Sequence, residues 1–166
     1  MLTLILLLLP FVSGLLLFWN KNAGIVKSGA IAVSIAQVAL FWDVSTAYKV
    51  EPSALDFSRQ WLPEFNLTFH LGMDGLSLLL CGLTVAVGGL IILATQGLAY
   101  DKMSRLLGLI LLTEAALIGV FTAKDAFVFY FFFEIALVPV YLIANIWGGE
   151  GITKVSLKMF IYTVFG

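Results

Sequence analysis

Long, uninterrupted apolar runs are the feature that most limits how this chain of 166 residues folds. Hydrophobic residues make up 61% of the chain and charged residues only 11%. A soluble domain carries about 25% charged residues. The chain therefore has too few polar side chains to cover the surface of a water-soluble globule, and the sequence predicts an integral membrane protein.

Five of these runs reach or approach the roughly 20 residues that a helix needs to cross a bilayer. Their apolarity is continuous, without the alternation of a barrel strand, so they predict helices. A sixth run starts near Val155 and is still short when the sequence stops at Gly166. We expect an all-α polytopic bundle, a single domain over residues 1–166, that forms the N-terminal part of something longer or comes from a broken reading frame. The complete spans predicted are Leu2–Trp19, Ile25–Trp42, Leu76–Thr95, Leu106–Phe121 (with a start nearer Met103) and Ala126–Trp147.

Basic residues are distributed unevenly between the two sets of connecting segments. Six follow the first, third and fifth spans and three lie on the other side, so the positive-inside rule places the six in the cytoplasm. The first run has no basic residue before it and no small-residue cleavage site, which favours a retained anchor over a signal peptide. We expect a multi-pass protein of the cell (inner or plasma) membrane with its N-terminus outside. The six are Lys21, Lys27, Lys102, Arg105, Lys154 and Lys158, and the three are Lys49, Arg59 and Lys124.

A polar stretch from Asp43 to Met73 separates the second and third spans on the outer side. Within it, residues 55–61 and 65–71 alternate between apolar and polar side chains, and Pro63 lies between the two segments. Period-two alternation on both sides of a proline-containing turn predicts a small β-hairpin, which we expect on the outer membrane surface.

Composition and motifs exclude several kinds of site. A net charge of -1 provides no basic surface for nucleic acid. A lone cysteine, Cys81, excludes a disulfide framework and an iron–sulfur cluster, and a lone histidine, His70, excludes a multi-histidine metal site. The Gly148–Gly151 segment follows a helix rather than a strand, so it predicts a turn and not a phosphate-binding loop. We expect no cofactor or metal on this chain.

A carboxyl near the middle of the fifth span is the strongest functional signal. Glu134 follows the aromatic run Phe129–Phe133. A carboxyl at that depth costs a few kcal/mol or more if it faces lipid, so such groups usually face protein or water and carry function. We expect Glu134 to be a proton-relay carboxyl. Pro139 has no N–H, which frees the Ile135 carbonyl to hold a water beside it. The structural alternative is a neutral acid bonded to a neighbouring helix, with Pro139 as a plain kink.

A second carboxyl, Glu114, lies in the middle of the fourth span. Ala115, Ala116 and Gly119 allow another helix to come close, so this carboxyl is expected to point into a bundle. A relay role and a structural hydrogen bond both stay open for Glu114.

Other polar residues lie at the ends of the predicted spans. Asp74 is well placed to cap the third span and Asp125 the fifth, because an aspartate can accept hydrogen bonds from the first helical turn. Lys124 is the neighbour of Asp125 in a tight outer turn. We interpret His70 as an interfacial or hairpin residue rather than a ligand.

These residues follow one another in an order that resembles a known family. The segment His70–Ser77 is followed by Gly119-Val-Phe121, Asp125, the Phe-rich run that ends in Glu134, and Pro139. The order resembles the N-terminal portion of the M subunit (chain 4 type) of proton-translocating NADH:quinone oxidoreductase, respiratory complex I. The Phe-rich run with a proline five residues after its glutamate is fairly specific to this subunit, whereas L-type, N-type and antiporter subunits usually differ there.

The resemblance implies an antiporter-like fold built from inverted repeats, in a membrane-arm subunit that couples electron transfer from NADH to quinone to proton translocation. It implies that Glu134 pairs with a lysine on a later, broken helix and that Glu114 matches a carboxyl found in many members. It also implies that the hairpin contacts neighbouring antiporter-like subunits. Flavin, iron–sulfur clusters and the quinone site would belong to other subunits.

Two alternatives stay open. The first is a subunit of a multi-subunit sodium/proton antiporter, which would show sodium-dependent proton flux without an electron donor; Pro139 and its surroundings argue against it. The second is a non-transporting membrane scaffold, in which Glu134→Gln changes only stability or assembly.

Overall fold

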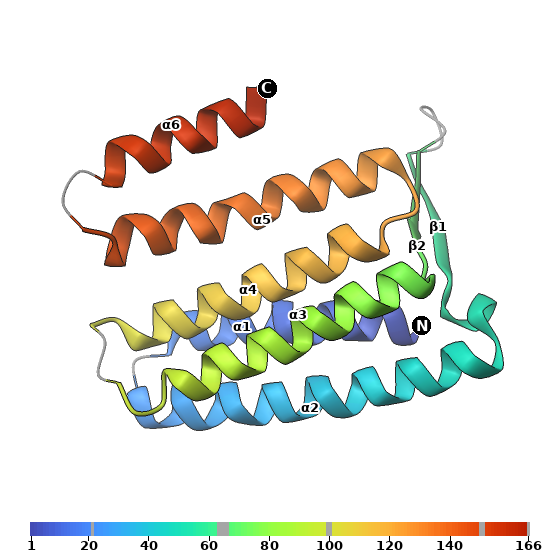
Figure 1. Cartoon of the computed structure of the whole chain (residues 1–166), viewed down its shortest axis with the longest axis horizontal. Helices are drawn as coiled ribbons and strands as arrows, with labels where there is room; N and C mark the ends of the chain where they lie inside the picture. Colours follow the sequence, from blue (N-terminus) through green and yellow to red (C-terminus); the bar gives the residue numbers. More distant parts are fainter. Residues whose placement is uncertain (21, 63–66, 99–100, 150–151, 166) are drawn as a thin grey trace.

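A computed structural model describes residues 1–20, 22–62, 67–98, 101–149 and 152–165 of the chain. In that part, six α-helices lie roughly side by side, with a two-stranded hairpin at one end of the bundle (Figure 1). Five of the helices are long and apolar enough to cross a membrane, which confirms the predicted helix bundle. The elements are α1 (Leu2–Trp19), α2 (Ala23–Val50), a 3₁₀ turn η1 (Pro52–Leu55), β1 (Phe57–Leu62), β2 (Leu67–Leu71), α3 (Gly75–Ala94), α4 (Met103–Thr122), α5 (Ala126–Trp147) and α6 (Ile152–Phe165).

The hairpin marks one end of the bundle, here called the hairpin end. The N-terminus, the last turns of α2 and α4 and the first turns of α3 and α5 lie at this end (Figure 1). The last turns of α1, α3 and α5 and the first turns of α2, α4 and α6 lie at the opposite end (Figure 1). The two groups of basic residues predicted on opposite sides of the membrane therefore lie toward opposite ends of the bundle, except for Lys158, which lies in the middle of α6, and Lys21, which lies outside the described residues.

Helix α4 forms the centre of the bundle and packs against α1, α2, α3 and α5. Its backbone meets that of α1 closely, because a Cβ added at Gly108 would lie 2.9 Å from the Gly14 carbonyl oxygen and 3.0 Å from the Phe18 Cα. Small residues at such crossings let helices approach in a membrane, where apolar side chains gain little by leaving lipid. Several of the most completely buried side chains belong to this helix, among them Leu107, Leu111 and Ile118.

Strands β1 and β2 pair antiparallel, with Phe57 opposite Leu71 and Arg59 opposite Phe69, which confirms the predicted hairpin. Its predicted turn, residues 63–66, lies outside the described residues. The segment between α4 and α5 continues the pairing, because the Lys124 N–H donates to the His70 carbonyl at 2.9 Å. The hairpin is thereby attached to the α4–α5 connection.

Helix α2 is longer than the sequence predicts. It continues to Val50, past the expected end at Trp42, so the polar stretch expected to start at Asp43 begins as a helix. The hydroxyls of Ser45 and Thr46 donate to helix carbonyls one turn back, at 2.8 and 2.9 Å, which satisfies these polar side chains within the helix itself. The helix ends before Pro52, because a proline disfavours helical geometry in the residue that precedes it.

Candidate functional site

Glu134 lies on α5, and its side chain is half-buried. The Tyr130 hydroxyl, one turn earlier, is hydrogen-bonded to the Glu134 carboxyl. The Oε1 atom of this carboxyl is buried and has no hydrogen-bond partner among the described residues. One oxygen of a carboxyl in the middle of a span is therefore left for a proton, a water or a group from elsewhere in the protein.

The aromatic run before Glu134 joins α5 to the hairpin. The Trp61 ring of β1 lies edge-on to Phe131, with ring centroids 5.8 Å apart, and the Phe69 ring of β2 lies 6.1 Å from Phe132. Contacts of this kind add about 0.5–1.5 kcal/mol beyond the apolar area that they bury. The aromatic run that precedes Glu134 thus holds the first half of α5 against the hairpin.

Pro139 is buried inside α5, which continues as a helix to Trp147. Since proline has no N–H, the Ile135 carbonyl cannot receive its usual helical hydrogen bond. A backbone acceptor without its usual helical donor thus lies next in sequence to Glu134, on the same helix. That this carbonyl holds a water stays a prediction.

Glu114 lies inside the bundle with only 4% of its surface exposed, in the place that the small residues after it predict. The Gln37 amide nitrogen on α2 donates a hydrogen bond to its Oε1 at 3.3 Å. Its Oε2 is buried without a partner among the described residues and lies against Gly88 of α3, where an added Cβ would come within 2.9 Å. Glu114 is therefore held between α2 and α3.

The two carboxyls have different surroundings. An apolar cavity of about 560 Å³ opens between α3, α4 and α5, and Glu114 lies in its wall together with Gly88 and Ile143, whereas Glu134 does not. In the part of the chain that the structure describes, the only ion pair lies elsewhere, at the hairpin end. Each carboxyl is thus without a cation from the described residues.

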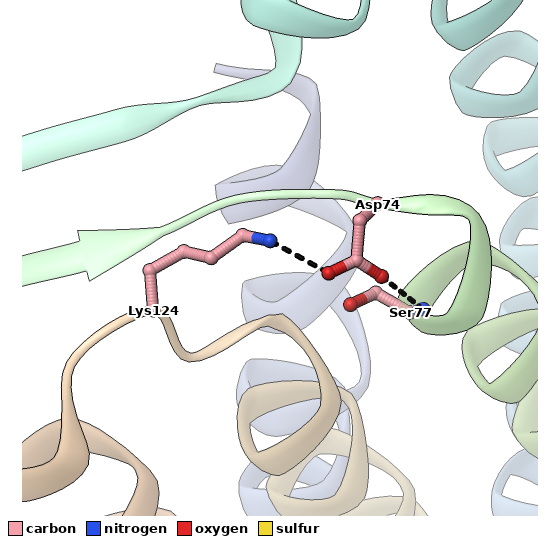
Figure 2. A network of polar contacts seen from close by, with 3 residues as sticks. All are labelled: Asp74, Ser77 and Lys124. Atoms are coloured by element: carbon pink, nitrogen blue, oxygen red, sulfur yellow. Dashed lines mark hydrogen bonds and ion pairs between the residues drawn. The ribbon is translucent and has the colours of Figure 1, made fainter.

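Asp74 connects three segments at the hairpin end (Figure 2). Its carboxylate accepts a hydrogen bond from the Ser77 N–H at 2.8 Å, which caps α3 as predicted, and it pairs with the Lys124 ammonium at 2.8 Å. The Lys124 ammonium and the Ser77 N–H together hold the pKa of Asp74 well below its usual value. Asp125 accepts from the Phe127 N–H at 2.8 Å and caps α5, also as predicted.

His70 lies in β2 opposite Ser58, where its backbone carbonyl serves the pairing with Lys124. This position agrees with a hairpin residue. Sequence reasoning missed Gln37, which lies in the apolar run of the second span. A buried amide inside a membrane span is itself a signal, because an unpaired polar group in hydrocarbon is costly.

No family model matches the chain. It is 34% identical, over 96% of its length, to "F(420)H(2) dehydrogenase subunit M" of Methanosarcina mazei, and covers 32% of that protein. It is 34% identical to "NADH-quinone oxidoreductase subunit M" of Rickettsia prowazekii and 33% identical to that of Escherichia coli, over 95% of this chain and 34% of each relative. Over nearly all of its own length, the chain is similar to these subunit M proteins. It spans about a third of the length of the curated relatives that it matches.

The fold of this chain is also found in solved structures. A chain of "Respiratory complex I from Thermus thermophilus with bound NADH" matches with a TM-score of 0.84 and 30% identity over 99% of this chain and 33% of that chain. A chain of an archaeal membrane-bound sulfane sulfur reductase matches with a TM-score of 0.79 over 96% of this chain and 25% of that chain; at 23% identity, this likeness shows the fold alone. Both neighbours are chains of respiratory complexes, and this chain is a multi-pass membrane protein.

Proposed function

We propose that a protein containing this segment is a membrane-arm subunit of a proton-translocating NADH:quinone oxidoreductase. It would couple electron transfer from NADH to quinone to the movement of protons across the membrane. The similarity to subunit M over 95% of the chain supports this family-level assignment. The single observation that carries the mechanism is the Glu134 carboxyl, which lies in the middle of α5 with a buried oxygen that has no hydrogen-bond partner in the described part of the chain.

Glu134 would act as a proton-relay carboxyl. One oxygen is held by Tyr130 on the same helix, and the other has no hydrogen-bond partner among the described residues, so it is available to a group that comes and goes. A cation that approaches a buried carboxyl favours proton release, and withdrawal of the cation favours uptake. The resemblance implies that a lysine on a later, broken helix supplies this cation. Glu114 is the second relay candidate.

The redox centres of the complex would lie on other subunits. We assign flavin, iron–sulfur clusters and the quinone site to those subunits, and neighbouring antiporter-like subunits to the surface around the hairpin. We place the hairpin end on the outer side of the membrane, because six of the nine basic residues follow the first, third and fifth spans, on the side away from the hairpin.

The test is Glu134→Gln in the full-length protein, within its assembled complex. The substitution keeps the size of the side chain but removes the titrating group, so NADH-driven proton pumping should lose most of its rate while the complex still assembles. Glu51→Gln is the matched control, because Glu51 is exposed beyond the end of α2 and the amide oxygen can still accept from Ser53.

Unchanged pumping by an assembled Glu134→Gln complex would overturn the relay role. Sodium-dependent proton flux without any electron donor would favour the antiporter alternative instead. A loss of assembly without a specific loss of pumping would favour the scaffold.

A further inference from the structure

Glu114 and Gln37 face each other between two membrane-spanning helices. Glu114 on α4 is 4% exposed and Gln37 on α2 is fully buried. One hydrogen bond joins them, from the amide nitrogen of Gln37 to Oε1 of Glu114 at 3.3 Å. Each group therefore directs one of its two polar atoms at the other.

The second polar atom of each group is an unpaired acceptor. Glu114 Oε2 and Gln37 Oε1 are both buried and without a partner among the described residues. An ionised carboxylate offers no hydrogen, so it cannot satisfy the amide oxygen, and its own charge would stay unpaired. Leaving a buried acceptor unsatisfied is costly, and the cost is larger for a charged group.

A single proton on the acid would supply the hydrogen-bond donor that these two acceptors lack. A protonated carboxyl has one O–H donor and one carbonyl acceptor, and a primary amide has the complementary N–H donor and carbonyl acceptor. With the proton on Oε2, the acid can donate to Gln37 Oε1 while it accepts from Gln37 Nε2. The two planar groups then form a closed ring of two hydrogen bonds with no net charge.

We infer that Glu114 and Gln37 form a neutral acid–amide pair that binds one proton between α2 and α4, at a site separate from Glu134. Gln37 is the positioning residue of this site, because its amide supplies both hydrogen-bond partners of the acid. The site differs from Glu134, whose described hydrogen-bond partner is Tyr130 on its own helix.

Gly88 leaves the space that the protonated oxygen occupies. A Cβ at Gly88 would lie 2.9 Å from Glu114 Oε2 and 3.0 Å from its carboxyl carbon. An alanine at this position would push the acid away from the geometry of the pair. Gly89, the next residue on α3, has nothing within 4 Å of an added Cβ and provides a matched control on the same helix.

The test is infrared spectroscopy of the complex that contains the full-length protein, with Glu114→Gln as the reference. The wild-type spectrum minus the Glu114→Gln spectrum should contain the C=O band of a hydrogen-bonded carboxylic acid. Carboxylate bands in its place, with no acid band, would overturn the inference. Glu114→Gln suits this subtraction, because an amide can make the same two hydrogen bonds with Gln37.

Two further spectra test the positioning role. In Gln37→Leu the acid band should move to the higher frequency of a carboxyl that has lost its partner, or convert into carboxylate bands. Gly88→Ala should also shift the band, whereas Gly89→Ala should leave it in place. A band that is identical in wild type, Gln37→Leu and Gly88→Ala would overturn the acid–amide pair, even if Glu114 proved to be protonated.

The outcome is independent of the relay assigned to Glu134. The infrared band reports the protonation of Glu114 whether or not Glu134→Gln reduces proton pumping. The pumping assay likewise reports the role of Glu134 whether or not the band is present. The two measurements therefore fail separately.

Discussion

At the scale of single residues, Asp74 stabilises the hairpin end through two contacts of different kinds. It caps α3 through the Ser77 N–H and pairs with Lys124 from the α4–α5 connection. Asp74→Asn keeps a good capping group and removes the ion pair, which we expect to cost up to about 1 kcal/mol, because the pair is partly exposed. Asp74→Ala removes the cap as well and should cost about 1 kcal/mol more. Thermal unfolding of the purified protein in detergent measures both.

The pH dependence provides the control for this ion pair. Since the folded protein lowers the pKa of Asp74, the stabilisation is complete above the ordinary value of about 3.9 and is lost as the pH falls through the lower folded value. Wild type should therefore lose its advantage over Asp74→Asn only below about pH 4. Adding Lys124→Met to Asp74→Asn should cost little further stability. An advantage that persists in strong acid would contradict the assignment.

The residue scale is also where sequence reasoning reached its limit. Both predicted caps were correct, because a cap depends on an aspartate and the three residues after it. Gln37 and the Lys124–Asp74 pair were not predictable in the same way, since each partner lies 50 or more positions away along the chain. Such contacts depend on which helices become neighbours, and local patterns do not carry that information.

At the scale of elements, the crossing of α1 and α4 depends on glycine. Gly108→Ala would bring a methyl group against the backbone of Gly14 and Phe18, which cannot rotate away as a side chain would. We expect the two helices to be forced apart at a cost of about 1–3 kcal/mol. Unfolding in detergent should show the loss, and Gly89→Ala, which meets open space, should show none. Equal stability of the two variants would mean that the crossing is loose.

The elements themselves were largely predictable. Continuous apolarity over membrane-spanning lengths determines where helices form, and the alternating segments gave the hairpin its two strands. The main error was in α2, which carries Asp43 and Lys49 in its last turns and still continues to Val50. A hydropathy pattern marks where the apolar part of a helix ends. The helix itself continues until its backbone is stopped, here by Pro52.

At the scale of the whole molecule, the apolar surface agrees with a lipid environment. Large apolar side chains are exposed on helices on several sides of the bundle, including Leu16 at 69%, Leu76 at 68% and Ile35 at 66%. The outer face of α5 is also open, with Tyr130 at 50% and Val138 at 44%. A protein with this surface would aggregate in water, whereas in a bilayer the lipid tails contact the same apolar side chains.

The direction in which the bundle crosses the bilayer follows from charge. Six of the nine basic residues follow the first, third and fifth spans in the sequence, on the side away from the hairpin, so we expect the hairpin end to face outwards. Two single substitutions test this in the full-length protein in intact cells: Ala54→Cys in the exposed η1 turn, and Gly97→Cys, where an added Cβ meets open space. A membrane-impermeant maleimide should label position 54 directly and position 97 only after permeabilisation. Cys81 is fully buried and should stay unlabelled in both, so it supplies the background. Labelling in the reverse order would show that the bundle has the opposite orientation, with the hairpin end facing the cytoplasm.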